Sequence, residues 1–283
     1  MEADMSLVRT QPERHVINCA DRLGWKDGVA GRSAIIEQSF NKPLPFIPTV
    51  IYGLRHINVA AKDSPRVALS LPSVTEWGFS LGLKSFLHPT WNLEANVMVL
   101  PNGAFPFQHG FVDASDNQGG RKSTDNASIH VTFTKPFAKT PKVAVWFTEI
   151  SQPKGQRSLR TSAVDIPPTS MRIIIETWDG REFDGARVAY LAYPDNNDAI
   201  KGGSTVFGPK EDWKLTDWHG GPFKSEPCVF TAINMIDVGE NDDTVDIIVD
   251  HEYSTAKQIR HCGWASKWTG LRQIGQCWIG ILC

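Results

Sequence analysis

Apolar residues along this chain come in short bursts, and within several bursts they alternate with polar residues at period two. Val67–Leu71 and Phe79–Leu83 show the alternation, which is typical of half-buried strands. Pro, Gly, Asp and Asn separate the bursts at intervals of about 8–15 residues, and no segment has the 3.6-residue period of an amphipathic helix. The pattern predicts an all-β protein built from antiparallel sandwiches.

The bursts fall into three similar groups, which gives the expected strands. The first group is 34–40, 49–57, 66–71, 77–83 and 95–100. The second is 128–134, 142–150, 159–164, 171–177 and 186–193. The third is more divergent, at 228–235, 244–253, 258–264 and 273–282, and a short strand is also expected at 15–18.

A Pro-x-Val motif opens one burst in each group, at Pro48, Pro141 and Pro227, each preceded by Phe and Lys-Pro or Pro-Phe. The intervals are 93 and 86 residues, longer than the period of a solenoid repeat, which is about 20–50 residues. The spacing predicts three copies of one small domain, with boundaries at 1–103, 104–200 and 201–283. The linkers at 101–106 and 193–203 are short, which favours copies in contact.

The order Phe, Lys-Pro, Pro-x-Val, a strand opened by Arg66, Gly78-Phe79 and Thr90-Trp91 resembles the H-type lectins, the family of the snail agglutinins and the C-terminal domain of the discoidins. The resemblance implies a six-stranded antiparallel β-sandwich for each copy. It also implies that the three copies pack as a pseudo-trimer and bind galactose- or N-acetylgalactosamine-type sugars in clefts between copies.

The same resemblance implies ligand-binding residues, because the family holds its sugar with an acid, an Arg and a polar residue after a motif Trp. An Arg fork, a carboxylate and an aromatic face suit the hydroxyls and the C–H patch of a sugar. The alternative for these side chains is a structural role. Each Trp would then pack in the core at the end of a strand, and each Arg would be a solvated charge on an edge strand. The implied residues are Arg66, Trp91 and Asn92 in copy one, Arg157 (or Arg160), Trp178 and Asp179 in copy two, and Trp268 in copy three.

Charge and composition narrow the classes of partner that we expect this protein to bind. The net charge of −2 gives no electrostatic footprint for nucleic acid or an anionic membrane. No apolar run reaches the ~20 residues of a membrane span, and the N-terminus lacks the apolar core of a signal peptide, so a cytoplasmic location is expected. Neither a cofactor nor a metal is expected, because no matching motif is present. The five Cys lack a C-x-x-C pair and predict free thiols, with Cys262 and Cys277 as the pair to bridge if one forms.

A second class of function stays open beside sugar binding. Ten Trp are present, and a cleft between copies lined by Trp could bind a small apolar or polyphenolic ligand. Such a pocket could act as a cofactor-independent cyclase of the hetero-Diels–Alder type found in fungal secondary metabolism, by orientation alone. A non-catalytic interaction scaffold is a third alternative. The tryptophans of this pocket would be Trp77, Trp91, Trp146, Trp178 and Trp264.

Overall fold

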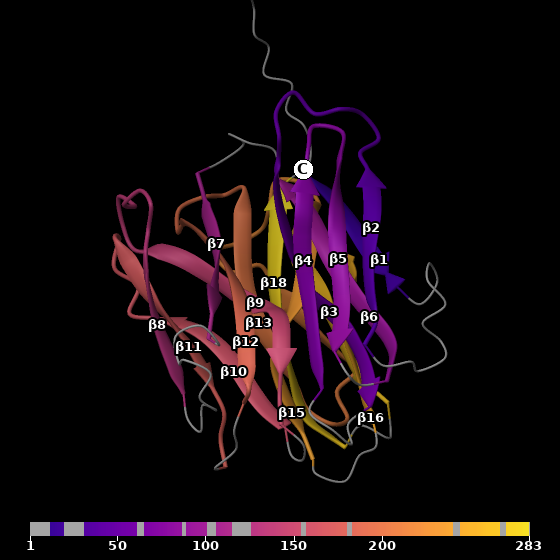
Figure 1. Cartoon of the computed structure of the whole chain (residues 1–283). Coiled ribbons are helices and arrows are strands. Elements are labelled where there is room, and N and C mark those ends of the chain that lie inside the picture. The colour runs from indigo at the N-terminus through magenta and orange to yellow at the C-terminus, as the bar shows by residue number, and fades with distance from the viewer. Residues whose placement is uncertain are drawn as a thin grey trace, which may run out of the picture.

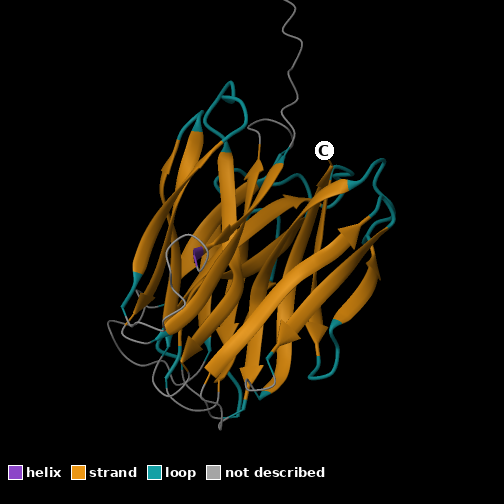
Figure 2. Cartoon of the chain, turned by 90° about the vertical axis from the view of Figure 1, so that its right-hand side faces the viewer, coloured by secondary structure: helices purple, strands orange, loops and turns teal. Residues whose placement is uncertain are grey.

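A computed structural model describes residues 12–19, 31–60, 65–86, 89–100, 106–114, 126–153, 157–179, 183–239, 244–266 and 270–282. Its 18 elements are all β-strands, which confirms the predicted all-β class. Figure 2 shows that the strands fill the molecule and that the loops gather at its ends. The described part of the chain contains no helix long and apolar enough to cross a membrane.

The strands follow one another in three groups of six, called repeats 1, 2 and 3 below. Repeat 1 holds β1 (Glu13–Asn18), β2 (Ser33–Ser39), β3 (Thr49–Ala60), β4 (Arg66–Val74), β5 (Gly78–Phe86) and β6 (Thr90–Leu100). Repeat 2 holds β7 (Gln108–Asp113), β8 (Ala127–Thr132), β9 (Pro141–Ser151), β10 (Arg157–Val164), β11 (Ser170–Glu176) and β12 (Gly185–Pro194). Repeat 3 holds β13 (Ile200–Phe207), β14 (Trp213–Asp217), β15 (Pro227–Val238), β16 (Thr244–Ser254), β17 (Gln258–Ala265) and β18 (Leu271–Leu282).

These strands form three six-stranded antiparallel sheets, and each sheet takes three strands from each of two repeats. The orders are β1-β6-β3-β16-β17-β14, β7-β12-β9-β4-β5-β2 and β13-β18-β15-β10-β11-β8. Adding six to every strand number, with 18 followed by 1, converts each order into the next. This topology is consistent with three β-sandwich repeats arranged cyclically. In Figure 1 the strands of repeat 1 lie on the right and those of repeat 2 on the left.

Three strand pairs join the repeats, and we call them seams. Seam 1/2 is β4 with β9, seam 2/3 is β10 with β15, and seam 3/1 is β16 with β3. Across these seams Arg66 pairs with Ser151, Ser158 with Asp237 and Asp246 with Asn58. These three partners each lie ten residues after the Pro of a Pro-x-Val motif. The register therefore defines which positions in the three repeats are equivalent.

The strands that carry Pro-x-Val meet in a central apolar cluster contributed by all three repeats. Five residues after each Pro stand Gly53, Trp146 and Ala232. A Cβ added at Gly53 would lie 2.5 Å from both Ala232 Cβ and Trp146 Cδ1. The Trp146 indole donates a 2.7 Å hydrogen bond to the Tyr52 carbonyl. One large ring thus occupies the centre because the two equivalent residues are small.

Several expectations need correction. Three strands were missed, namely β7, β13 and β14. Trp91 was expected to precede the last strand of its copy, but it lies inside β6, whereas Trp178 precedes β12 by seven residues. Trp91 and Trp178 therefore do not occupy equivalent positions.

The expectation of free thiols is wrong at one cysteine. Cys228 is disulfide-bonded. Cys19, Cys262 and Cys277 are thiols that take no part in a disulfide. The bridge expected between Cys262 and Cys277 is therefore not formed.

Candidate functional site

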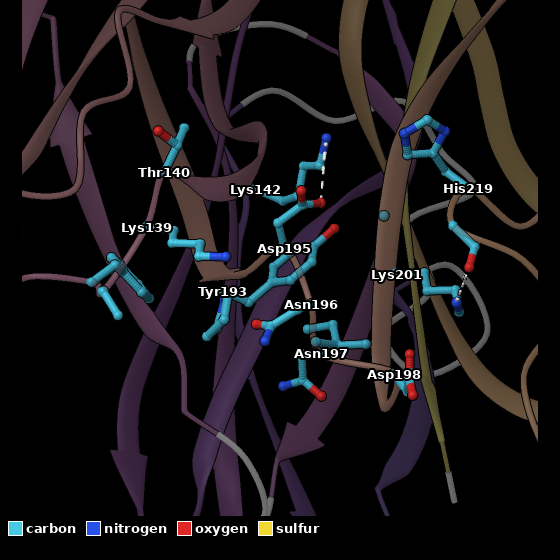
Figure 3. Close-up of a pocket in the computed structure, with 16 residues that line it drawn as sticks. Lys139, Thr140, Lys142, Tyr193, Asp195, Asn196, Asn197, Asp198, Lys201 and His219 are labelled. Atoms are coloured by element: carbon cyan, nitrogen blue, oxygen red, sulfur yellow. Dashed lines mark hydrogen bonds and ion pairs between the residues drawn. The ribbon is translucent and has the colours of Figure 1, made fainter.

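An open cleft of about 940 Å³ lies where repeat 2 ends and repeat 3 begins. Its volume is typical of sites that bind small molecules, which run from about 300 to 1,000 Å³. Repeat 2 supplies the turn before β9 and the end of β12, and repeat 3 supplies the start of β13 and the turn before β15. Figure 3 shows polar side chains from both repeats around the opening.

One wall comes from the turn before β9. Phe137 fixes this turn, since its backbone N–H donates to the Pro168 carbonyl at 2.9 Å and its ring packs edge-to-face on Phe133 at 5.0 Å. The next residues expose Lys139 and Thr140 along the cleft (Figure 3). The segment just before the Pro-x-Val motif of repeat 2 therefore builds one wall of the cleft.

The linker between the repeats forms the middle of the cleft. Lys142 Nζ lies 3.5 Å from Asp195 Oδ1. Asn197 holds the linker turn, because its N–H donates to the Pro194 carbonyl and its side-chain oxygen accepts from the Ala199 N–H at 3.0 Å. The Asx turn is a familiar use of Asn, and here it leaves the neighbouring Asn196 exposed to the cleft.

Tyr193 is a buried residue of the cleft lining. Its side chain is buried, and this burial raises the pKa of the hydroxyl. A Cβ at Gly202 would stand 3.0 Å from the Tyr193 oxygen, so glycine at this position lets the ring pack.

The opposite wall holds Lys201 and His219. Lys201 is 7% exposed, and its Nζ donates to the Gly220 carbonyl at 3.3 Å. Gly220 and Gly221 have φ values of 83° and 94°, in the region that favours glycine. The tight turn they make brings the Gly220 carbonyl to Lys201 and leaves His219 exposed at the rim.

The cleft can therefore offer amide, carboxylate, ammonium and imidazole groups to a polar ligand. In the part of the chain that the structure describes, no cluster of His, Cys, Asp and Glu is arranged to hold a metal ion. What the side chains can supply is hydrogen bonding in several directions, as a polyhydroxylated ligand requires.

None of the six predicted ligand-binding residues that the structure describes lines this cleft. Arg66 lies at seam 1/2, where Nε is 2.7 Å from Glu149 Oε1 and the guanidinium stacks 4.3 Å from the Phe86 ring centroid. The Arg66 side chain remains 44% exposed, so one edge of its fork is open to solvent. A role for Arg66 in ligand binding stays a prediction.

Asn92 lies at a different seam from Arg66. It donates to His56 Nδ1 at 3.0 Å and to Glu94 Oε1 at 2.8 Å, and His56 Nε2 is 2.8 Å from Asp246 Oδ1 across seam 3/1. Trp91, beside Asn92, is half-buried. Arg66 and Asn92 were expected together in one site. Arg66 contacts repeat 2, whereas the cluster that contains Asn92 contacts repeat 3.

The cluster around Asn92 continues into a charged network that was not predicted. Arg55 bridges Glu94 and Asp250, and Arg14 Nη2 is 2.7 Å from Asp250 Oδ1. Burial alone would raise the pKa of Asp250, but His251, Arg55 and Arg14 hold it well below its usual range. Because the charges are paired and mostly covered, the network joins repeats 1 and 3 and leaves little surface for a ligand.

The residues predicted in copy two are also apart from the cleft. Arg157 is buried at the start of β10, and Ser158, rather than an Arg, occupies the position equivalent to Arg66. The Ser158 hydroxyl accepts from the Trp178 N–H and donates to the Trp178 carbonyl, both at 3.2 Å. Asp179 is exposed with φ of 61°. Trp268 lies outside the described residues.

The five tryptophans expected to line an apolar pocket are dispersed. Trp146 is fully buried at the centre, whereas Trp77 and Trp264 are 68% and 48% exposed. Trp91 and Trp178 are half-buried, and no tryptophan among the described residues lines the cleft. The arrangement therefore contradicts the Trp-lined pocket on which the cyclase alternative depends.

Comparison with known proteins connects this architecture to one family. Residues 128–193 match the family model of the H-type lectin domain. The match covers nearly all of the segment from β8 to β12 and includes residues 137–140, Lys142 and Tyr193, which line the cleft. No curated protein and no solved structure matches the chain. The match supports a carbohydrate-binding, lectin-like fold in repeat 2.

Proposed function

We propose that this protein is a lectin that binds a saccharide in the cleft between repeats 2 and 3. The observation that carries the proposal is the overlap between the lectin-domain match and the cleft, because the matched segment supplies one wall and Tyr193. The polar lining supports it, since sugar hydroxyls need donors and acceptors at close spacing.

Galactose and N-acetylgalactosamine are the sugars to test first. This specificity follows from the resemblance to H-type lectins. Asp195 and Asn196, both exposed at the cleft, are suited to the paired hydroxyls of a hexose, one as acceptor and the other as both donor and acceptor.

The test is a glycan array followed by titration calorimetry with galactose and N-acetylgalactosamine. Asp195→Ala and Asn196→Ala should each weaken binding by roughly 1 kcal/mol, the usual contribution of one hydrogen bond. Asn41→Ala changes an exposed Asn in repeat 1 and should have no effect.

Two further variants test the location. Arg66→Ala and Trp91→Ala change the residues that the family resemblance marks in repeat 1. Loss of binding in these two, with Asp195→Ala and Asn196→Ala unaffected, would move the site to the seams of repeat 1. A blank array with folded protein would reject sugar binding altogether.

A further inference from the structure

Lys201 is the one buried lysine among the described residues, and it lines the cleft. Its Nζ contacts are the Gly220 carbonyl at 3.3 Å and the face of the Phe223 ring, 5.2 Å from the centroid. No carboxylate of the described residues lies within ion-pair distance of it. A buried ammonium usually has a carboxylate partner, because burial without one is costly. The side chain therefore brings uncompensated positive charge and unused hydrogen-bond donors to the cleft wall.

The equivalent positions in the other repeats show that this charge is particular to one cleft. Lys201 pairs with Gly280, which in turn pairs with the Val of the third Pro-x-Val motif. By the same register, Glu13 of β1 and Gln108 of β7 are its equivalents. One position thus carries an acid, a neutral amide and a base in repeats 1, 2 and 3. The fold does not require a lysine there, since the same strand pairing forms with Glu and Gln.

The other charges around the cleft do not neutralise Lys201. Asp195 already faces Lys142 at 3.5 Å. Asp198 lines the cleft without an ion pair to Lys201, and Lys139 and His219 lie exposed on the two walls (Figure 3). Three lysines therefore face two aspartates, and the most deeply buried of these groups is positive.

From this arrangement we propose that the saccharide is acidic, with a carboxylate or sulfate group that pairs with Lys201. The inference rests on the proposed function and names the class of sugar that the same cleft takes. The carboxylate or sulfate accepts from Nζ beside the Gly220 carbonyl, while the hydroxyls of the ring face Asp195 and Asn196. Charge-assisted hydrogen bonds of this kind are about twice as strong as neutral ones.

The experiment compares matched neutral and acidic sugars by titration calorimetry with the full chain. The probes are galactose, galacturonate and galactose 6-sulfate, at low and high salt. The acidic sugars should bind at least about tenfold more tightly than galactose, and added salt should reduce this preference. The uronate and sulfate arms distinguish the two anionic groups.

Variants assign the preference to one side chain. Lys201→Met keeps the length and apolar stem of the side chain and removes its charge, so it should abolish the preference for acidic sugars. Lys201→Arg should retain much of it. Lys210→Met removes an exposed lysine outside the cleft and should leave the preference intact. If Lys201→Met does not fold, the sugar series on the unaltered protein and on Lys201→Arg still decides whether the protein prefers acidic sugars.

The outcomes separate this inference from the proposed function. If galactose binds and neither acidic sugar binds more tightly, the inference is wrong and sugar binding stands. If the preference persists in folded Lys201→Met, Lys201 is not its source and the inference is wrong. If none of the three sugars binds, the proposed function fails and the inference fails with it.

Discussion

Arg66 and Glu149 form an ion pair across seam 1/2, and at the counterpart positions across seam 3/1 the Asp246 carboxylate lies 2.8 Å from His56 Nε2. Glu149 and His56 each lie eight residues after the Pro of their motif, and Arg66 and Asp246 are equivalent by register. At seam 2/3 the two positions hold Ser158 and Met235, which cannot form an ion pair. The three seams share a backbone register and differ in side-chain chemistry.

Loss of the ion pair at seam 1/2 should have little effect on stability. Arg66 is half-exposed, and exposed pairs contribute about 0–1 kcal/mol because water screens them. We expect Arg66→Ala to lower the free energy of unfolding by less than about 1 kcal/mol. Urea denaturation measures this, and a loss several times larger would show that the pair holds the seam together.

The charged network at seam 3/1 should matter more. Arg55 contacts Glu94, whose side chain is 8% exposed, and also Asp250. Arg55→Ala leaves a buried carboxylate with fewer partners, and we expect a loss of about 3 kcal/mol. Arg160→Ala, which breaks the exposed pair with Glu176, is the matched control and should cost less than about 1 kcal/mol. Equal losses in the two variants would contradict this difference.

The centre of the molecule should not accept a methyl group at Gly53. The added Cβ would overlap Trp146 and Ala232 at 2.5 Å, so Gly53→Ala should destabilise the protein by about 1–3 kcal/mol through overpacking. Thermal unfolding gives the measurement. At Gly239 the nearest atom to an added Cβ is 3.4 Å away, an ordinary contact, and Gly239→Ala should be close to neutral.

Stability should fall as the pH falls below about 6.5, and His261 supplies part of the reason. His261 is fully buried, and neither ring nitrogen has a hydrogen-bond partner. Burial, with the nearby His251, lowers the pKa of His261 to about 3. The unfolded chain takes up a proton near pH 6.5 and the folded protein does not, so acid favours unfolding by up to about 1.4 kcal/mol per pH unit between these values.

His261→Phe removes this titration and fills a similar volume beside Trp278. Urea denaturation at pH 7.5 and 5.0 should show a smaller pH dependence in this variant than in the unaltered protein. The exposed His219 provides the control, since His219→Gln should not change the pH dependence of unfolding. An unchanged dependence in His261→Phe would assign the acid sensitivity to other groups.

The sequence predicted the fold well where a run of apolar residues follows a Pro-x-Val motif, as in β3, β9 and β15. It missed β13, where Gly202 and Gly203 interrupt the apolar pattern, and β14, whose Trp213 and Leu215 are exposed. Glycine at 202 and 203 makes room for the Tyr193 and Trp278 side chains, a long-range requirement that a local pattern does not reveal.

The cleft was harder to predict than the fold. The linker at 193–203 indicated from its length only that the copies are in contact, and nothing in the sequence marked its polar residues as a ligand-binding surface. Lys201 lies within that linker, and its environment depends on Gly220 and Phe223, about twenty residues further along the chain. The sequence alone does not distinguish a buried lysine from a surface lysine, because the difference lies in the tertiary contacts.

Because every sheet is shared by two repeats, no repeat carries a complete sheet of its own. Removal of any repeat would leave two half-sheets, each with an unpaired strand edge. The chain should therefore melt as one cooperative unit, with a single calorimetric transition, although its sequence reads as three modules in a row. Cleavage within a linker, in contrast, would cut the covalent chain while the three seams still join each repeat to the other two.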